Sequence, residues 1–338
     1  MHDLAERILK GEVRAAARAM RLVDDHMPGA VDVLKDLFPH TGKAWVLGVT
    51  GNPGSGKSTL CDRLIEHFRK QDKRVGVIAV DPTSPYSGGA ILGDRIRMTR
   101  HATDDGVFIR SVATRGHLGG LSRSARDLVR ILDAFGSDVV IVETVGVGQD
   151  ELEITRTAHT TLVVMAPGLG DDVQAIKAGL MECADAFAVN KADRDGADAT
   201  VRDLQLMIAL GSETMIAAGK QRGHVVHSEQ DGTVENAKAS QPWTPPIVKC
   251  VALRGEGIGE LVTALEKHHA WVSDTPEGRA RRHARLAEEL RETLREALID
   301  AATDKLGPAI DEAVHAVETK TRDPYTATEE LVAKFRSG

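Results

Sequence analysis

The stretch that decides the fold is Gly51-Asn52-Pro53-Gly54-Ser55-Gly56-Lys57-Ser58-Thr59, which matches the pattern G-x-x-x-x-G-K-[ST] at every fixed position. The apolar run 44–50 precedes it, and the helix-like run 59–70 follows it. Glycines allow a backbone to turn several N–H groups toward one point, and a helix N-terminus adds a dipole that favours anions. Lys57 adds a positive charge, and the Ser58 hydroxyl suits a magnesium ion. In this context we expect all nine residues to bind a nucleoside triphosphate, rather than to form a glycine-rich structural turn.

The composition fits a soluble globular protein, with 42% hydrophobic and 28% charged residues among 338. The net charge is -7 without a basic arm, which argues against nucleic-acid binding, because phosphate backbones need clustered Lys and Arg. No apolar run approaches membrane-spanning length and no signal-like core begins the chain, so we expect no membrane partner. The cysteines Cys61, Cys183 and Cys250 lie far apart, which disfavours disulfides and a zinc site. A cytoplasmic location fits best, with an organelle matrix as the alternative.

Strand-like and helix-like runs alternate from residue 44 onward. The expected strands are short and mostly β-branched: 45–50, 75–80, 107–112, 139–143, 161–165, 186–190 and 247–253. The expected helices lie between them: 57–70, 91–102, 122–135, 149–157, 171–184 and 197–217. Such alternation predicts an α/β fold, a mostly parallel, doubly wound sheet of the P-loop NTPase kind. Its ligand is expected at the carboxyl ends of the strands.

Helical extensions are expected at both ends of the chain. Residues 1–42 form an N-terminal helical segment, with one helix over 2–24 and a second after Pro28-Gly29. Residues 43–270 form the nucleotide-binding domain, in which the polar segment 219–246 is a small hairpin or an exposed loop. The C-terminal arm, 271–338, has an apolar stripe at Leu286, Leu290, Leu294 and Leu298. Pro308 and Pro324 are expected to divide the helices of this arm.

The motif Asn190-Lys191-Ala192-Asp193 ends a strand-like run and has the N-K-x-D form of a guanine reader. The Asp193 carboxylate can accept hydrogen bonds from guanine N1–H and the 2-amino group, a donor pair that adenine lacks. Asn190 can position the loop near the N7 edge, and the Lys191 stem can lie along the ring. A helix-start turn is the alternative for four residues alone, but downstream of a phosphate loop the motif favours GTP or GDP as the nucleotide.

The run Cys250-Val251-Ala252-Leu253 stands where GTPases place a last base-contacting loop. Backbone N–H groups of Val251, Ala252 and Leu253 are therefore candidates for contact with guanine O6.

Acidic residues near the ends of predicted strands are candidate Mg²⁺ ligands beside Ser58: Asp81, Asp94 and Glu143. Magnesium takes one or two protein oxygens together with phosphates and water, so not all three acids bind directly. Asp81 and Asp94 could each be a helix cap instead.

Glu143 and Gly146 have the positions of the Walker B carboxylate and of the glycine that senses the γ-phosphate. Lys57, Asp94, Glu143 and Gly146 are accordingly the candidate catalytic residues. Many GTPases carry a Gln after that glycine to orient the attacking water. Here Val147 follows and Gln149 is two places further, so we expect slow hydrolysis until a partner completes the site.

Together these motifs resemble the MeaB/ArgK family of P-loop GTPases, whose human member is the methylmalonic aciduria type A protein. The resemblance runs from about Leu4 to the C-terminal helices and rests on five stretches: 51–59, 80–85, 88–98, 143–149 and 190–193. It implies a GTPase that chaperones an adenosylcobalamin-dependent mutase, with GTP hydrolysis gating cofactor delivery. It also implies a homodimer formed through the C-terminal helices.

By the same resemblance residues 168–178 are a third switch, with Asp171 and Lys177 as its charged contacts. Two features depart from the family pattern. The segment 219–246 is longer, and Cys250-Val251-Ala252-Leu253 stands where a Ser-Ala-Leu run is usual.

Three other functions compete with a regulatory GTPase. A kinase or transport ATPase conflicts with the guanine motif 190–193, and a metallochaperone would need Cys or His clusters that this sequence lacks. A scaffold that senses GTP and barely hydrolyses it remains open because of Val147.

Overall fold

The computed structural model describes residues 2–81, 99–101, 103–113, 120–144, 157–168, 184–221 and 243–337. These fall into two compact units, Met1–Ala280 and Arg281–Gly338. Most of the predicted helices 91–102, 149–157 and 171–184 and most of the polar segment 219–246 lie outside the described residues.

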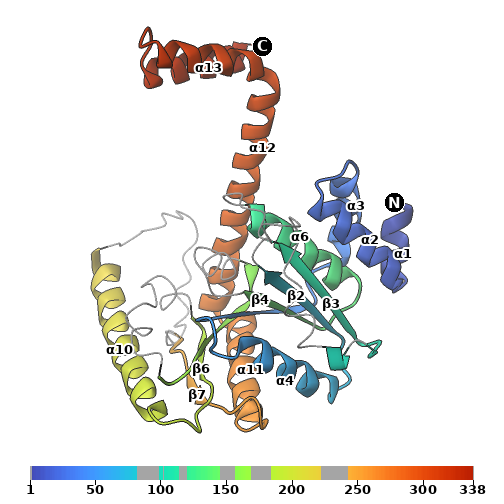
Figure 1. Ribbon diagram of the computed structural model, residues 1–338, viewed down its shortest axis with the longest axis vertical. Coiled ribbons are helices and arrows are strands. Elements are labelled where there is room, and N and C mark those ends of the chain that lie inside the picture. The colour runs from blue at the N-terminus through green and yellow to red at the C-terminus, as the bar shows by residue number, and fades with distance from the viewer. Residues whose placement is uncertain are drawn as a thin grey trace, which may run out of the picture. The chain divides into compact units, whose positions relative to one another are not determined.

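A sheet of parallel strands forms the centre of the first unit (Figure 1). Its strands are β1 (Trp45–Thr50), β2 (Val75–Asp81), β3 (Val107–Ala113), β4 (Val139–Thr144), β5 (Thr160–Met165), β6 (Ala186–Val189) and β7 (Ile247–Lys249). Their order is β3-β2-β4-β1-β5-β6-β7, and each neighbouring pair is parallel. The predicted α/β fold is confirmed. The last strand is shorter than predicted, because the chain turns away after Lys249.

Both faces of the sheet are buried, which explains the continuous apolar strands. Successive residues of a strand point to opposite faces. In β1, Leu47 packs into one hydrophobic core and Val46 into another; in β4, Ile141 and Val140 do the same. A fully buried parallel strand needs apolar residues at every position, and β1 and β4 are buried throughout.

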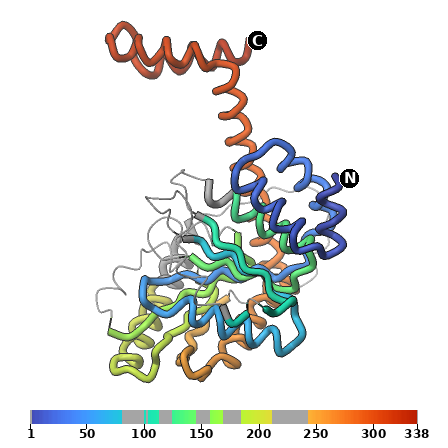
Figure 2. Tube along the Cα trace, turned by 45° about the vertical axis from the view of Figure 1, so that its right-hand side comes forward, coloured from blue at the N-terminus to red at the C-terminus, as the bar shows by residue number. Residues whose placement is uncertain are grey.

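Helices cover the two faces. Helices α4 (Lys57–Arg69) and α11 (Ile258–Asp274) pack on one face. The other face is covered by α6 (Gly120–Ala134) with α1 (Asp3–Leu9), α2 (Val13–Asp24) and α3 (Ala30–Leu37), and by α10 (Ala197–Gln221). Figure 2 shows the N-terminal helices against this side of the sheet. Short 3₁₀ turns, η1 (Phe38–His40) and η2 (Thr99–His101), complete the described elements. The sheet is therefore doubly wound, as predicted.

The N-terminal segment differs from prediction in one respect. We expected one helix over 2–24, but α1 ends at Leu9 and α2 begins at Val13. Gly11 lies between them with a φ of 81°, a left-handed conformation that ends a helix. The break lets residues of both helices, including Ile8 and Met20, face the same core.

The second unit contains most of α12 (Pro276–Glu318) and all of α13 (Pro324–Ser337). Pro324 begins a helix as predicted, but the prediction that Pro308 interrupts one was wrong, since α12 continues through it. A proline inside a helix removes one backbone hydrogen bond. Burial of the neighbouring Leu306 and Ala309 compensates for this loss.

No helix in the described ranges combines the length and the apolar character needed to span a bilayer.

Candidate functional site

The phosphate loop connects β1 to α4 at the carboxyl edge of the sheet, as the sequence predicts. Gly51 and Gly56 have φ angles of 134° and 92°. A Cβ atom at Gly51 would collide with the Val164 backbone oxygen, and one at Gly56 would collide with the Asn190 amide. Only glycine fits these two positions, so the loop can lie directly on β5 and on the predicted guanine motif.

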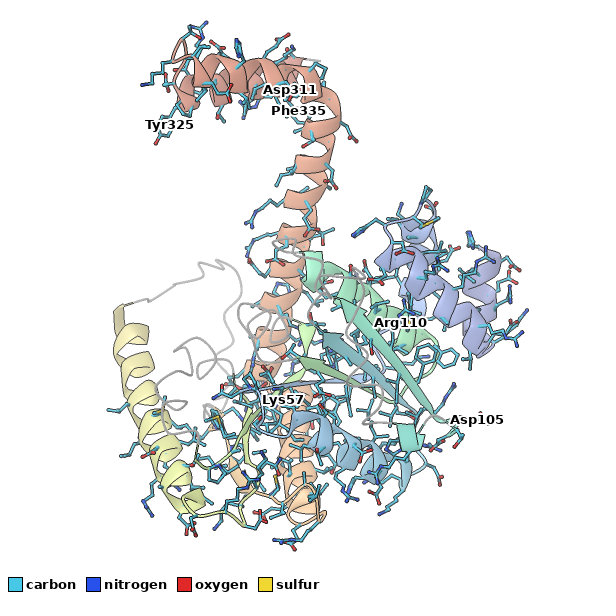
Figure 3. The ribbon with its side chains drawn as sticks, viewed as in Figure 1. Lys57, Asp105, Arg110, Asp311, Tyr325 and Phe335 are labelled. Carbon is cyan, nitrogen blue, oxygen red and sulfur yellow. The ribbon has the colours of Figure 1, made fainter. Side chains whose placement is uncertain are left out.

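Lys57, labelled in Figure 3, is the first residue of α4, and its side chain turns back to the loop that precedes the helix. The Lys57 ammonium donates hydrogen bonds to the carbonyl oxygens of Gly51 at 2.7 Å and Asn52 at 3.0 Å. The side chain is buried. A buried ammonium at the positive end of a helix dipole gives a strongly anion-attracting site.

Ser58 and Glu143 form the second part of the site. The Ser58 hydroxyl donates to Glu143 Oε1 at 2.7 Å, and both residues are buried. Parallel pairing brings them together, because Val49 of β1 lies beside Glu143 of β4. A hydroxyl and a carboxylate next to a phosphate loop are the oxygen ligands that Mg²⁺ prefers, so these residues fit that ion.

The other predicted acidic ligands are only partly described. Asp81 is the last residue of β2, and its neighbour Val80 pairs with Thr144. The backbone of Asp81 is thus at the same sheet edge as Glu143. Asp94, Gly146, Val147 and Gln149 lie outside the described residues, as do Asp171 and Lys177 of the predicted third switch.

Asn190 connects the loops of the site. Its amide nitrogen donates to the Ser55 carbonyl at 2.9 Å. Its amide oxygen accepts from the backbone N–H groups of Lys191 at 2.8 Å and Ala252 at 3.0 Å. Because Asn190 is buried, these bonds hold the phosphate loop, the 190–193 turn and the 250–253 turn in one arrangement.

Lys191 and Asp193 lie beside this connection. Lys191 has a φ of 57°, and its ammonium donates to the Gly54 carbonyl at 2.6 Å. Asp193 is exposed, and its carboxylate lies 3.5 Å from the Arg254 guanidinium. An open pocket of about 220 Å³ borders Asp193 and Val251. The predicted base-reading residues are thus brought together at one end of the phosphate loop.

Comparisons with known proteins agree with this geometry. Residues 16–306 match the family model described as methylmalonyl Co-A mutase-associated GTPase MeaB. The chain belongs to the MeaB family of GTPases.

Several relatives of this MeaB-family chain cover most of its length. A Pyrococcus abyssi protein is 44% identical over 99% of this chain and 97% of its own. The GTPase ArgK of Escherichia coli is 38% identical over 77% of this chain and 73% of its own. A crystal structure described as an LAO/AO transport system kinase matches with a TM-score of 0.65 and 27% identity, covering 99% of this chain and 97% of that chain. Guanine-nucleotide binding and GTP hydrolysis therefore follow from family membership.

Two residues of this MeaB-family site were not predicted from sequence. Arg63 of α4 donates to the Ala252 carbonyl at 2.9 Å and the Leu253 carbonyl at 2.7 Å. Arg254 contacts Asp193 and also binds Glu256 at 2.8 Å. The sequence pattern places Arg63 on the polar face of a helix, where a charged side chain is usually assigned to solvent. No local signal in the sequence therefore indicates its contact with the turn.

Metal-binding side chains do not cluster elsewhere in the described part of the chain. There, no three His, Cys, Asp or Glu side chains are placed to hold one ion.

Proposed function

We propose that this MeaB-family GTPase is a Mg²⁺-dependent switch that gates cofactor loading into an adenosylcobalamin-dependent acyl-CoA mutase and protects that enzyme in the cytoplasm. One observation carries the nucleotide part: Asn190 binds Ser55 of the phosphate loop and Ala252 beside the base-reading residues. The mutase part is supported by the family description and by a mouse relative, the mitochondrial methylmalonic aciduria type A homolog, which is 30% identical over 70% of this chain and 52% of its own.

Lys57 and the Ser58–Glu143 pair are proposed to handle the phosphates. Lys57 would exchange its bonds to Gly51 and Asn52 for phosphate oxygens, which neutralises charge as the terminal phosphate leaves. Ser58 and Glu143 would hold Mg²⁺, directly or through water, and that ion would supply further charge neutralisation. Asp81 and Asp94 remain proposed metal ligands, and Gly146 a proposed sensor of the γ-phosphate.

Slow turnover without a partner is a second part of the proposal. Val147 cannot orient a water molecule, so the mutase or another subunit is proposed to complete the site. Single-turnover hydrolysis of GTP should accelerate by at least roughly tenfold when methylmalonyl-CoA mutase is added. Fast hydrolysis of GTP by the chain alone, with no further acceleration when the mutase is added, would contradict the proposal that a partner completes the site.

The C-terminal arm, proposed as 271–338, is assigned to homodimer formation. Leu286, Leu290, Leu294 and Leu298 of α12 are 52–70% exposed, and they recur every four residues on one face. An apolar stripe of this kind favours association with a second copy. Light scattering should report a dimer for the natural chain and a monomer for Leu290→Glu. The control Glu292→Gln should remain dimeric.

The mutase assignment is tested by co-purification. A tagged chain loaded with a non-hydrolysable GTP analogue should retain adenosylcobalamin-dependent methylmalonyl-CoA mutase, and the GDP-loaded chain should retain it differently. The Lys57→Ala variant should lose this nucleotide dependence. Binding of a nickel or zinc ion instead, with no nucleotide-dependent capture of a mutase, would favour the metallochaperone function.

A further inference from the structure

The turn 250–256 leaves one backbone donor available. The N–H groups of the other residues of this turn donate to acceptors in the protein: Cys250 to Val189, Val251 and Glu256 to each other, Ala252 to Asn190, Arg254 to Val251 and Gly255 to Ala252. The Leu253 N–H has no acceptor among the described residues. Leu253 is 77% exposed, so this donor is the part of the turn that is accessible to an incoming ligand.

Arg63 controls the direction of that donor. Its Nε donates to the Ala252 carbonyl at 2.9 Å, and a terminal nitrogen donates to the Leu253 carbonyl at 2.7 Å. The chain has no cis peptide bond in its described parts, so the peptide joining Ala252 to Leu253 is planar and trans. In such a peptide the carbonyl and the N–H point in opposite directions. Holding the Ala252 carbonyl toward α4 therefore turns the Leu253 N–H away from α4.

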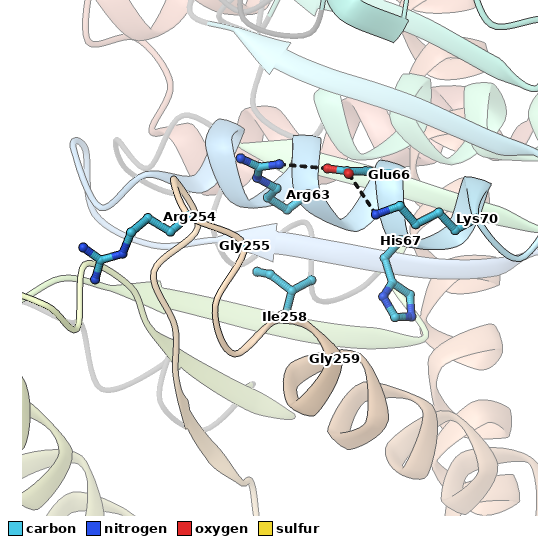
Figure 4. Close-up of a pocket in the computed structure, with 8 residues that line it drawn as sticks. All are labelled: Arg63, Glu66, His67, Lys70, Arg254, Gly255, Ile258 and Gly259. Atoms are coloured by element: carbon cyan, nitrogen blue, oxygen red, sulfur yellow. Dashed lines mark hydrogen bonds and ion pairs between the residues drawn. The ribbon is translucent and has the colours of Figure 1, made fainter.

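The guanidinium is itself held in place. A second terminal nitrogen of Arg63 lies 2.9 Å from Glu66, which also accepts from Lys70 at 2.9 Å (Figure 4). Hydrogen bonds from Lys70 and then Arg63 lower the pKa of Glu66 to about 2, so this anchor is ionised at any ordinary pH. These side chains line an open pocket of about 310 Å³ between α4 and the turn.

We propose that Arg63 is a positioning residue for guanine recognition, which aims the Leu253 N–H at guanine O6. It does so from the helix that begins at the phosphate-binding Lys57, so one helix would align both ends of the nucleotide. The inference rests on the proposed base-binding role of residues 250–253. It adds Arg63 to the residues of the base site, although Arg63 is 189 positions away in sequence from the Ala252 carbonyl.

Three diphosphates separate this role from a general effect on the loop. GDP and inosine diphosphate both carry O6, whereas 2-aminopurine riboside diphosphate keeps the 2-amino group and lacks O6. Calorimetric titration of Arg63→Ala should give roughly tenfold weaker binding of GDP and of inosine diphosphate, the effect of losing about one hydrogen bond. Binding of the 2-aminopurine nucleotide should change by less than about twofold.

Lys70→Ala is the matched control, because Lys70 is a cation on the same helix that binds the same Glu66 without touching the turn. All three affinities should stay within about twofold in that variant. Arg63→Lys should recover part of the loss, since an ammonium can hold a carbonyl but lacks the fork of donors. If Arg63→Ala does not fold, the same three affinities can be measured for Arg63→Lys instead.

Two outcomes would overturn the positioning role. Equal weakening for all three nucleotides would show a general loss of loop structure, and no weakening of GDP would show that the two carbonyl bonds are irrelevant to the base. If the natural chain itself does not bind GDP, the assignment of the base site fails. That result is seen without any substitution, so it differs from both outcomes for Arg63→Ala.

Discussion

The two edges of the same sheet differ in what their polar groups hold in place. At the carboxyl edge, cationic side chains bind backbone carbonyls of loops, as Lys57 does at Gly51 and Arg63 does at Ala252. At the amino edge, a buried histidine joins polar side chains beneath aromatic rings. His268 lies 3.0 Å from the Thr160 hydroxyl and 3.3 Å from the Asp185 carboxylate.

The amino edge also contains all three tryptophans of the chain: Trp45, Trp243 and Trp271. The indole N–H of Trp45 donates to Thr160 at 3.1 Å, and that of Trp243 donates to the Asp185 carbonyl at 2.8 Å. Large rings close this edge around a buried network, which serves stability. Glycines and helix N-termini at the other edge keep donors available for a ligand. Stability and nucleotide binding should therefore depend on different residues at the two edges.

The largest expected effect is on stability at the amino edge. Asp185→Ala removes the partner of buried His268 and the acceptor of the Thr161 N–H at 2.8 Å. Breaking a buried pair should lower the free energy of unfolding by about 3–5 kcal/mol. Urea unfolding should measure this loss, and the folded protein should bind GDP with unchanged affinity.

Asp198→Ala is the control for this comparison, because Asp198 is in an exposed ion pair with Lys249 at 3.0 Å. Its effect should stay below about 1 kcal/mol. If Asp185→Ala lowers the binding free energy of GDP as much as it lowers the free energy of unfolding, stability and nucleotide binding are not divided between the two edges.

The converse variant is Lys57→Ala at the carboxyl edge. Loss of the buried ammonium should weaken GTP and GDP binding by about 10- to 150-fold, because a charge-assisted hydrogen bond to phosphate contributes about 1.5–3 kcal/mol. The thermal midpoint without nucleotide should change little. Lys43→Ala removes an exposed lysine just before β1, at the opposite edge, and should leave binding intact. An affinity for GDP in Lys57→Ala equal to that of the natural chain would contradict the phosphate assignment.

Local patterns were sufficient for most of the fold. Apolar runs identified each described strand, and the glycine-rich loop identified the edge where the site lies. Two errors came from contacts that local preference does not show. Pro308 remains helical beside buried Leu306, and the turn after Lys249 is stabilised by the pairing of Val251 with Glu256. These partners are near in sequence, but a sequence window does not tell which residues are buried or paired.

The site could be predicted where one motif carries the chemistry. Lys57, Ser58 and Asp193 belong to such motifs, and Glu143 follows from its position after a strand. Arg63 could not be predicted, because its partner carbonyls lie 189 and 190 positions away in sequence. The bond from Asn190 to Ser55 spans 135 positions, so its connecting role is also a product of the fold.

A smaller effect is expected from Asp193→Asn, which tests base choice within the carboxyl edge. The amide can no longer accept two hydrogen bonds from guanine, but it can donate to the 2-oxo group of xanthine. GDP binding should weaken by about tenfold and xanthosine diphosphate binding should strengthen. Asp195→Asn, in the same exposed turn, should change neither. Retained preference for guanine over xanthine in Asp193→Asn would remove this residue from the base site.

The smallest effect is expected at Cys250, where the proposed base-binding turn joins the core. Its backbone belongs to the open edge, but its side chain is buried, and burial raises the pKa of the Cys250 thiol to about 12. A thiol that is neither ionised nor accessible should not react with an aromatic disulfide at pH 8. When folded, the natural chain and Cys250→Ser should therefore release equal amounts of aromatic thiolate from this reagent. After unfolding in guanidinium chloride, the natural chain should release one equivalent more. If the folded natural chain reacts faster than folded Cys250→Ser, the Cys250 thiol is accessible and this turn opens to solvent. The open carboxyl edge would then extend into the core.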